Sequence, residues 1–195
     1  GTMVQVAVTD LAAYFDDEIT AMPNLVTVGA GGTASTVAGI PFFSADNSIY
    51  THDVSGTDDT AQHNAAYGIG AMDAITTGDQ NSALGYNALS ANNTGAQNTA
   101  MGRLSLEANT SGDNNTAYGS STLSANSTAD DNTAIGKGSM QANTTGAANT
   151  AVGKDSLKAN TTGTRNLAIG YQAYTASDTE NDNLAIGYQA MLANT

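Results

Sequence analysis

The sequence predicts an all-β solenoid of 17-residue coils, and three observations carry that prediction. Blocks of the form Asn, small or apolar, Ala, large apolar, Gly recur eight times without insertion. Each block alternates like a short strand, and Asn and Gly recur at fixed offsets between blocks, as turns require. A fixed short period indicates one supersecondary unit stacked on copies of itself. The blocks start at Asn64, Asn81, Asn98, Asn115, Asn132, Asn149, Asn166 and Asn183.

The first strand of each coil is expected at positions one to four, counting the Asn as position zero. Alternation puts positions one and three on one face and positions two and four on the other. Position three is large and apolar, and position one becomes Leu167 and Leu184 in the last two copies, so we expect this face to be buried. The position-three column is Tyr67, Leu84, Met101, Tyr118, Ile135, Val152, Ile169 and Ile186.

A second strand is expected around position eight, which is apolar in every copy. Position ten is Ala in all eight copies and alternates in phase with it. Positions one, three, eight and ten would then form a narrow core between two parallel sheets. The position-eight column is Met72, Leu89, Leu106, Leu123, Met140, Leu157, Tyr174 and Met191.

The other face of the first strand carries Ala at position two and Gly at position four in all eight copies. Gly weakens a strand unless another backbone comes close, and a face open to water has no reason to exclude larger side chains. We therefore expect the Ala column to pack against another subunit of a homo-oligomer. This column is Ala66, Ala83, Ala100, Ala117, Ala134, Ala151, Ala168 and Ala185.

The corners of the coils are expected at positions eleven and fourteen, which are Asn in six copies and Gly in five. Asn side chains can hydrogen-bond up and down a stack, and Gly accepts sharp turns. Ala129, Ser177 and Glu180 break these columns, so we expect local irregularity there. Asn143 and Asn160 lie in glycosylation sequons, but we interpret them as corner residues.

Residues 1–23 are expected to form a helical, coiled-coil-like segment, in which Gly1 and Thr2 are a cloning remnant. The helix would span residues 4–22, end at Pro23 and associate with copies of itself. A strand near the start, followed by a helix capped at Thr9 or Asp10, is the alternative. The proposed seam is Val4, Val8, Leu11, Phe15 and Met22, with Glu18 or Ile19 between.

Residues 24–63 are interpreted as an irregular β connector, with β-prone stretches at 25–28, 40–43 and 49–51 and a Gly-rich link at 29–36. His52 and His63 lie near several Asp residues, but without ligand spacing they are interpreted as solvated side chains. Residues 64–195 are the eight repeats. The chain ends inside the eighth, so we expect the natural protein to be longer.

The composition narrows the function classes. The net charge is −13, and all five Lys and Arg lie in the repeats, which argues against nucleic acid and anionic membranes as partners. Without Cys there are no disulfides or thiolate metal sites. No apolar run is long enough to insert in a membrane. No nucleophile–base pair recurs, so we expect no enzyme, no cofactor and no metal.

The block Asn166–Gly170 and the Ala-Asn-Thr-Thr-Gly corners resemble the head repeats of YadA-like trimeric autotransporter adhesins. That resemblance implies a left-handed parallel β-roll with three rolls around one axis. The 17-residue period is longer than the adhesin repeat and is similar to repeats of bacteriophage tail fibres. The segment Phe15–Leu25 is also similar to the junctions between helix and repeats in those fibres.

The leading hypothesis is therefore a homotrimeric phage tail-fibre segment on the virion, acting as a shaft or as a head for host-surface recognition. The alternative is the head of a bacterial trimeric adhesin on the cell surface. Ice or mineral binding is a third class, disfavoured because the adjacent Thr residues at positions twelve and thirteen point opposite ways. Any host glycan or protein would contact variable outward positions, with Tyr86, Tyr171 and Tyr188 the candidate receptor contacts.

Overall fold

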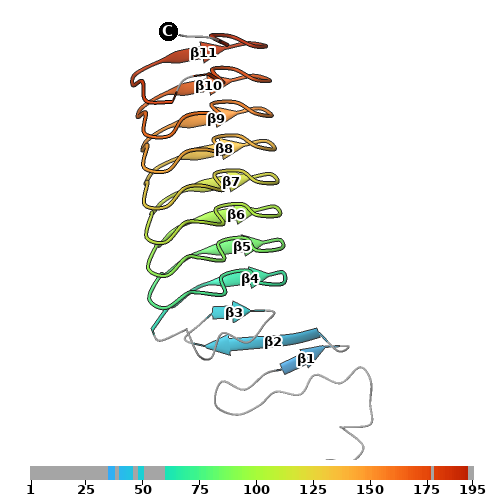
Figure 1. The fold of residues 1–195 in the computed structure, drawn as a ribbon. Coiled ribbons are helices and arrows are strands. Elements are labelled where there is room, and N and C mark those ends of the chain that lie inside the picture. Colours follow the sequence, from blue (N-terminus) through green and yellow to red (C-terminus); the bar gives the residue numbers. More distant parts are fainter. Residues whose placement is uncertain (1–34, 38–39, 46–47, 51–59, 177, 193–195) are drawn as a thin grey trace, which may run out of the picture.

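The computed structural model describes residues 35–37, 40–45, 48–50, 60–176 and 178–192. Within them the chain is a parallel β-solenoid that climbs one strand per repeat (Figure 1). The prediction of an all-β solenoid with 17-residue coils is confirmed. The repeat strands are β4 (Ala65–Tyr67), β5 (Ser82–Leu84), β6 (Thr99–Met101), β7 (Thr116–Tyr118), β8 (Thr133–Ile135), β9 (Thr150–Val152), β10 (Leu167–Ile169) and β11 (Leu184–Ile186).

Three further strands precede the repeats: β1 (Ser35–Val37), β2 (Ile40–Ala45) and β3 (Ser48–Tyr50). They pair antiparallel with one another, and β3 then pairs parallel with β4. Strands are therefore present in two of the three stretches expected to be β-prone, whereas β1 overlaps the expected Gly-rich link. The expected helix, the stretch 25–28 and His52 lie outside the described residues.

The repeat strands pair in parallel with a register of one whole coil. Ala134, for example, lies opposite Ala117 in the strand below and Ala151 in the strand above. Identical positions thus stack on one another throughout, so each column of the sequence is a column in space. The last strand belongs to an eighth coil whose residues 193–195 lie outside the described part.

The expected second strand is absent from the described coils, and turns occupy that segment instead. Positions six and eight adopt left-handed backbone angles, such as φ 58° at Leu104 and φ 50° at Leu106. This conformation costs a non-Gly residue about 1–2 kcal/mol. Burial of Leu106, which is 0% exposed, offsets that cost by about 2 kcal/mol. The position-eight column is thus buried as predicted, but from a turn rather than from a strand.

The first strand has the opposite orientation to the one predicted. Position two is buried inside the coil, from Ala66 at 4% exposed to Ala134 at 0%, and the flanking positions one and three face outward. The whole Ala column, predicted to contact another subunit, is therefore enclosed by its own chain. The physical reason is width, because the strand lies across a thin coil from the large position-eight side chains and only Ala fits between them.

Buried Asn side chains satisfy the backbone along two columns. At position zero, Asn98 donates its backbone N–H to Asn81 Oδ1 at 2.9 Å and its Nδ2 to the Gly112 carbonyl at 2.8 Å. At position eleven, Asn109 Nδ2 donates to Asn92 Oδ1 at 2.8 Å and to the same Gly112 carbonyl at 3.0 Å. The predicted Asn stacking at the corners is confirmed. Asn143 and Asn160, which lie in glycosylation sequons, are buried in these columns.

Position four requires Gly because the next coil approaches its backbone. Gly136 has φ 123°, and a Cβ built on it would lie 2.6 Å from the carbonyl carbon of Gly153, one coil further on. The close backbone predicted from the Gly column is therefore real. It belongs to the same chain and not to a second subunit.

Two buried polar atoms in the sixth and seventh coils lack a hydrogen-bond partner in the described structure, whereas the Glu180 corner is regular in that its carbonyl accepts Asn166 Nδ2 at 2.8 Å. Tyr174 fills position eight, and its hydroxyl is buried without a hydrogen-bond partner in the described structure. Asn160 Oδ1 is likewise unpartnered, and the residue one coil above it is Ser177, which lies outside the described residues. Ala129 causes no break, since its carbonyl accepts hydrogen bonds from Asn115 and Asn126 as a Gly carbonyl does elsewhere.

Candidate assembly surface

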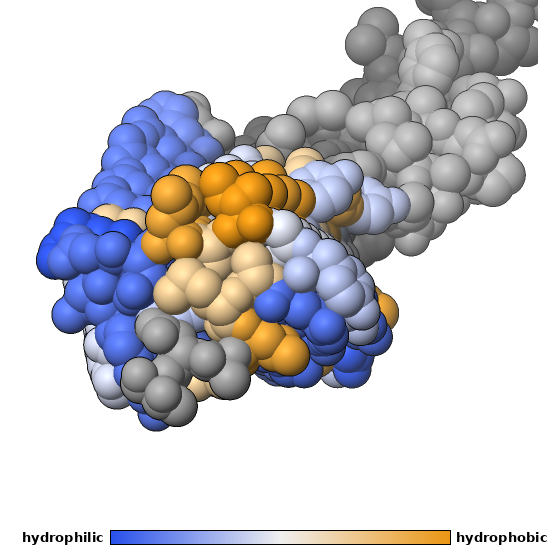
Figure 2. All heavy atoms as spheres, turned by 90° about the horizontal axis from the view of Figure 1, so that it is seen from above, coloured by the Kyte–Doolittle hydropathy of each residue, from blue (hydrophilic) through white to orange (hydrophobic). Residues whose placement is uncertain are grey.

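One face of the sheet presents apolar side chains to solvent. Positions one and three of the repeat strands point away from the coil, and we call these two columns the outward sheet face. Position three includes Tyr118 at 58%, Leu84 at 46% and Ile186 at 62% exposed. Seen down the solenoid, a row of hydrophobic residues runs along one side of the molecule, further hydrophobic residues lie at the end that faces the viewer, and polar ones cover much of the rest (Figure 2).

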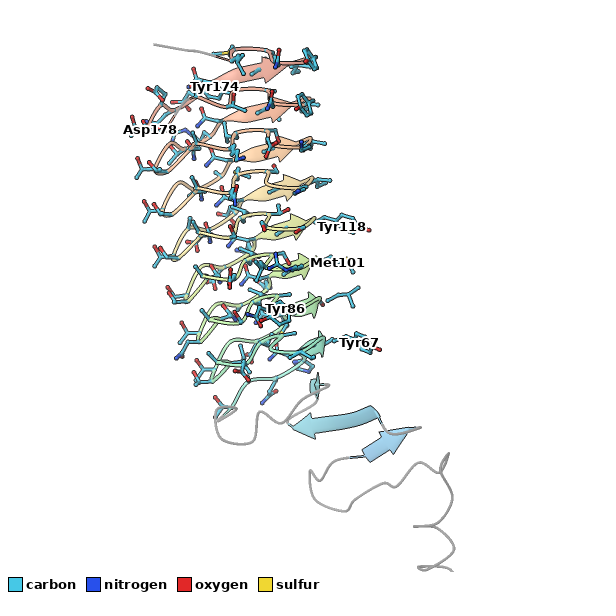
Figure 3. The ribbon with its side chains drawn as sticks, turned by 45° about the vertical axis from the view of Figure 1, so that its right-hand side comes forward. Tyr67, Tyr86, Met101, Tyr118, Tyr174 and Asp178 are labelled. Atoms are coloured by element: carbon cyan, nitrogen blue, oxygen red, sulfur yellow. The ribbon has the colours of Figure 1, made fainter. Side chains whose placement is uncertain are left out.

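The same column is visible from the side. Tyr67, Met101 and Tyr118 extend beyond the ends of their strands in one direction, whereas Asp178 lies at the opposite edge (Figure 3). Exposed apolar side chains scattered singly are ordinary, but a continuous column along every described coil is not. Large exposed apolar surfaces of this kind are typical of interaction sites.

The outward sheet face carries no charge. Positions one and three of the eight repeats contain no Asp, Glu, Lys or Arg, in a chain whose net charge is −13. Position one is Ala, Ser or Thr in the first six copies and Leu in the last two. Copies of the chain would repel one another on average, and this face is where they could approach without like-charge contact.

Position five forms a separate column at the end of the strands, and it contains all three candidate receptor residues. Tyr86, Tyr171 and Tyr188 are 50%, 38% and 74% exposed. The rings of Tyr171 and Tyr188 stack with centroids 5.5 Å apart and an interplanar angle of 10°. Lys154 Nζ lies 5.3 Å from the Tyr171 centroid, from the coil below. The structure therefore brings Tyr171 and Tyr188 together and leaves Tyr86 apart.

These contacts limit how the tyrosines could bind a sugar. Glycan stacking needs a free ring face, and Tyr171 lies between Lys154 and Tyr188, which cover both of its faces. Tyr86 has the Arg103 guanidinium 6.0 Å from its ring centroid, in cation–π geometry. These contacts stabilise the stacking of neighbouring coils, and Tyr188, at 74% exposed, keeps the largest free ring area of the three.

Ion pairs and a hydrogen bond link neighbouring side chains in this region. The Asp155 carboxylate forms ion pairs with Lys158 Nζ at 3.1 Å and with Lys154 Nζ at 3.6 Å. Gln189 Nε2 donates a hydrogen bond to Gln172 Oε1 at 2.9 Å. Exposed pairs of this kind contribute little stability. They hold Lys154 over the Tyr171 ring and leave the corner with a modest local positive charge.

One charged pair lies away from this region, on the corner at position sixteen. Arg165 makes a bidentate contact with Asp182, at 2.6 Å and 2.9 Å, from one coil to the next. The hydrogen bond from Arg165 holds the pKa of the Asp182 carboxyl below its usual range. The pair is fully exposed, so it adjusts coil stacking only slightly.

The described residues contain no group of three His, Cys, Asp or Glu residues that could hold a metal ion, and His63 is exposed. None of the described residues form a helix long and apolar enough to span a membrane. Sequence reasoning missed the outward sheet face because it assigned these columns to the core. The available signal was the varied size of position three, which ranges from Val to Tyr.

Comparisons with known proteins add no name to this architecture. No protein-family model, no curated protein and no solved structure matches the chain.

Proposed function

We propose that the chain is a structural and attachment protein: a homotrimeric fibre segment of a phage tail that acts as a rigid shaft or display head at a host surface. The observation that carries the proposal is the outward sheet face, an uncharged apolar column along every described coil. A thin solenoid of this kind has little interior of its own to bury. Covering this column would add a second apolar core to the molecule.

The partner that fits the column best is another copy of the chain. Its apolar side chains repeat once per coil, at the spacing of about 4.8 Å between neighbouring strands. A partner with a different rise would lose register within a few coils, whereas a second copy lying alongside keeps it throughout. Three copies around a common axis close cyclically and leave no face uncovered. That arrangement also agrees with the expectation from the resemblance to trimeric fibres.

Sedimentation equilibrium tests the assembly. We expect a mass three times that of the 19.6-kDa chain at micromolar concentration. Ile135→Glu should abolish association and leave the coil folded, because Ile135 is 40% exposed in the single chain. Thr145→Glu places the same charge at an exposed corner and should remain trimeric. A monomeric parent or a trimeric Ile135→Glu variant would contradict the proposal, and a dimer would refute the three-fold arrangement.

Attachment is the second part of the proposal, and the variable outward positions would provide the contacts. A trimer presents each of them three times, so that weak single contacts add up to useful avidity. Tyr86 tests this best, because it is half exposed and stands apart from the stacked pair. We expect the trimer to bind components of a glycan array and the Tyr86→Ala trimer to bind them less. No binding by either protein would leave the plain shaft as the function.

A further inference from the structure

The seventh and eighth coils differ from the others in how far the apolar surface extends. Here positions one, three and five are all large and apolar or aromatic. In the third to sixth coils, position one is Thr and position five is Arg, Ser or Lys. We call this region the terminal patch, which consists of Leu167, Ile169, Tyr171, Leu184, Ile186 and Tyr188.

The terminal patch is held in shape before any partner arrives. Leu167 pairs with Leu184 and Ile169 with Ile186 in strands β10 and β11, and the two Tyr rings are stacked. The stacked Tyr rings therefore lose little conformational freedom when they are covered, so more of the free energy of their burial appears as affinity. The patch side chains that lie below another coil are still open to solvent, since Ile169 is 37% and Tyr171 38% exposed.

Resting on the proposed homotrimer, we infer that the terminal patch anchors the association of copies, and that the remaining coils align along it. Four of the six patch residues belong to the outward sheet face, so a molecule that covers that face covers them as well, and the two stacked Tyr rings border it. Interfaces concentrate their energy in a few well-buried groups, Tyr prominent among them, surrounded by weaker contacts. The patch offers two Tyr rings beside four large aliphatic side chains, whereas each Thr-lined coil offers one large apolar side chain at these positions.

The consequence is an interface whose two ends differ in strength. The first two coils offer Ala65 and Ser82 at position one, so they contribute less apolar area than Leu167 and Leu184 do. Dissociation should therefore begin at the first coils, and loss of the terminal patch should release the whole assembly.

Two double variants of the full chain test the inference by sedimentation velocity over a concentration series. Leu167→Thr with Leu184→Thr restores the residue that four other copies carry at position one, so the coils should still fold. Leu84→Thr with Met101→Thr removes two apolar side chains of the same face at the other end. Circular dichroism checks that both variants keep the solenoid signal.

We expect the terminal-patch variant to raise the concentration of half-dissociation by at least about 10-fold, and the other variant by less than about 3-fold. Equal weakening would overturn the anchor and leave the proposed homotrimer intact, since the face would then contribute uniformly. No weakening by either variant would overturn both, because the outward sheet face would not be the interface. A stronger effect of the Leu84 and Met101 variant would place the anchor at the other end.

Discussion

Two glycines of the fifth coil offer a sharp test of how the coils stack. Gly136 at position four and Gly138 at position six both have positive φ, at 123° and 67°. Replacing either by Ala adds one methyl group. The two variants differ in what that methyl group meets, so their difference in stability measures the closeness of neighbouring coils.

The methyl group of Gly136→Ala would meet backbone. A Cβ there lies 2.6 Å from the carbonyl carbon and oxygen of Gly153, and it needs about 3.4 Å. The coils would have to separate by about 0.8 Å, which would stretch the 2.7 Å bond from Gly153 N–H to the Ile135 carbonyl to the limit of hydrogen bonding. One or two lost bonds at about 1 kcal/mol each, with about 2 kcal/mol of backbone strain, give about 3–4 kcal/mol.

The methyl group of Gly138→Ala would meet only Asp155 Oδ1, at the end of a side chain that can turn away. Other coils already place non-Gly residues at position six with similar angles, such as Asn87 at φ 52° and Leu104 at φ 58°. The left-handed conformation costs Ala about 1 kcal/mol, and the lower entropy of the unfolded chain offsets part of it. We expect a net loss below about 1 kcal/mol.

Thermal unfolding followed by circular dichroism separates the two variants. At about 2–4 °C per kcal/mol for a chain of this size, Gly136→Ala should melt about 10 °C below the parent and Gly138→Ala within about 3 °C of it. Equal melting temperatures would refute the argument, because they would mean that neighbouring coils leave room for a methyl group at position four.

Three further predictions concern the interior and the corners. Ala134→Glu should unfold its coil and not merely prevent assembly, because Ala134 is 0% exposed, whereas Gln141→Glu at a partly exposed site should leave the melting curve unchanged. Asn115→Ala should cost about 2–4 kcal/mol in urea unfolding, because the Asn132 N–H at 3.1 Å loses its buried acceptor and the Ala129 carbonyl loses one of its two donors. The Arg165–Asp182 contact should weaken as pH falls through the lowered pKa of Asp182 and be fully present at neutral pH; Arg165→Gln should return that pKa to its ordinary value in an NMR titration.

The period of the repeat was enough to predict the solenoid, because a strict 17-residue spacing leaves few other ways to stack. The Asn corners could also be predicted, since the amide of Asn both donates and accepts hydrogen bonds. The second strand could not, because the left-handed angles at Leu106 and its equivalents are imposed by the coil. Leu shows no intrinsic preference for them, so composition gave no sign of the turn.

The orientation of the first strand was predicted wrongly for a reason that carries over to other thin repeats. If large size indicates burial, the sequence places Ile135 inside and Ala134 outside. In a coil this narrow the interior limits volume strictly, and the invariance of Ala is the sign of burial. The varied sizes at position three indicate a surface where the single coil imposes no limit. The same reversal moved the candidate assembly site from the Ala column to the outward sheet face.

Because each strand pairs with the strand one repeat away, the length of this molecule is set by the number of its repeats. A segment of 17 residues could be inserted or removed at any corner, and each repeat position would still stack on the same position of the neighbouring coil. An insertion of any other length would have to loop out at its corner, because otherwise it would set Ala against Asn and Gly against Leu where the two parts of the stack meet. The solenoid can therefore be lengthened or shortened in steps of about 4.8 Å, and a gene that gains or loses whole repeats adjusts the reach of the molecule without redesigning it.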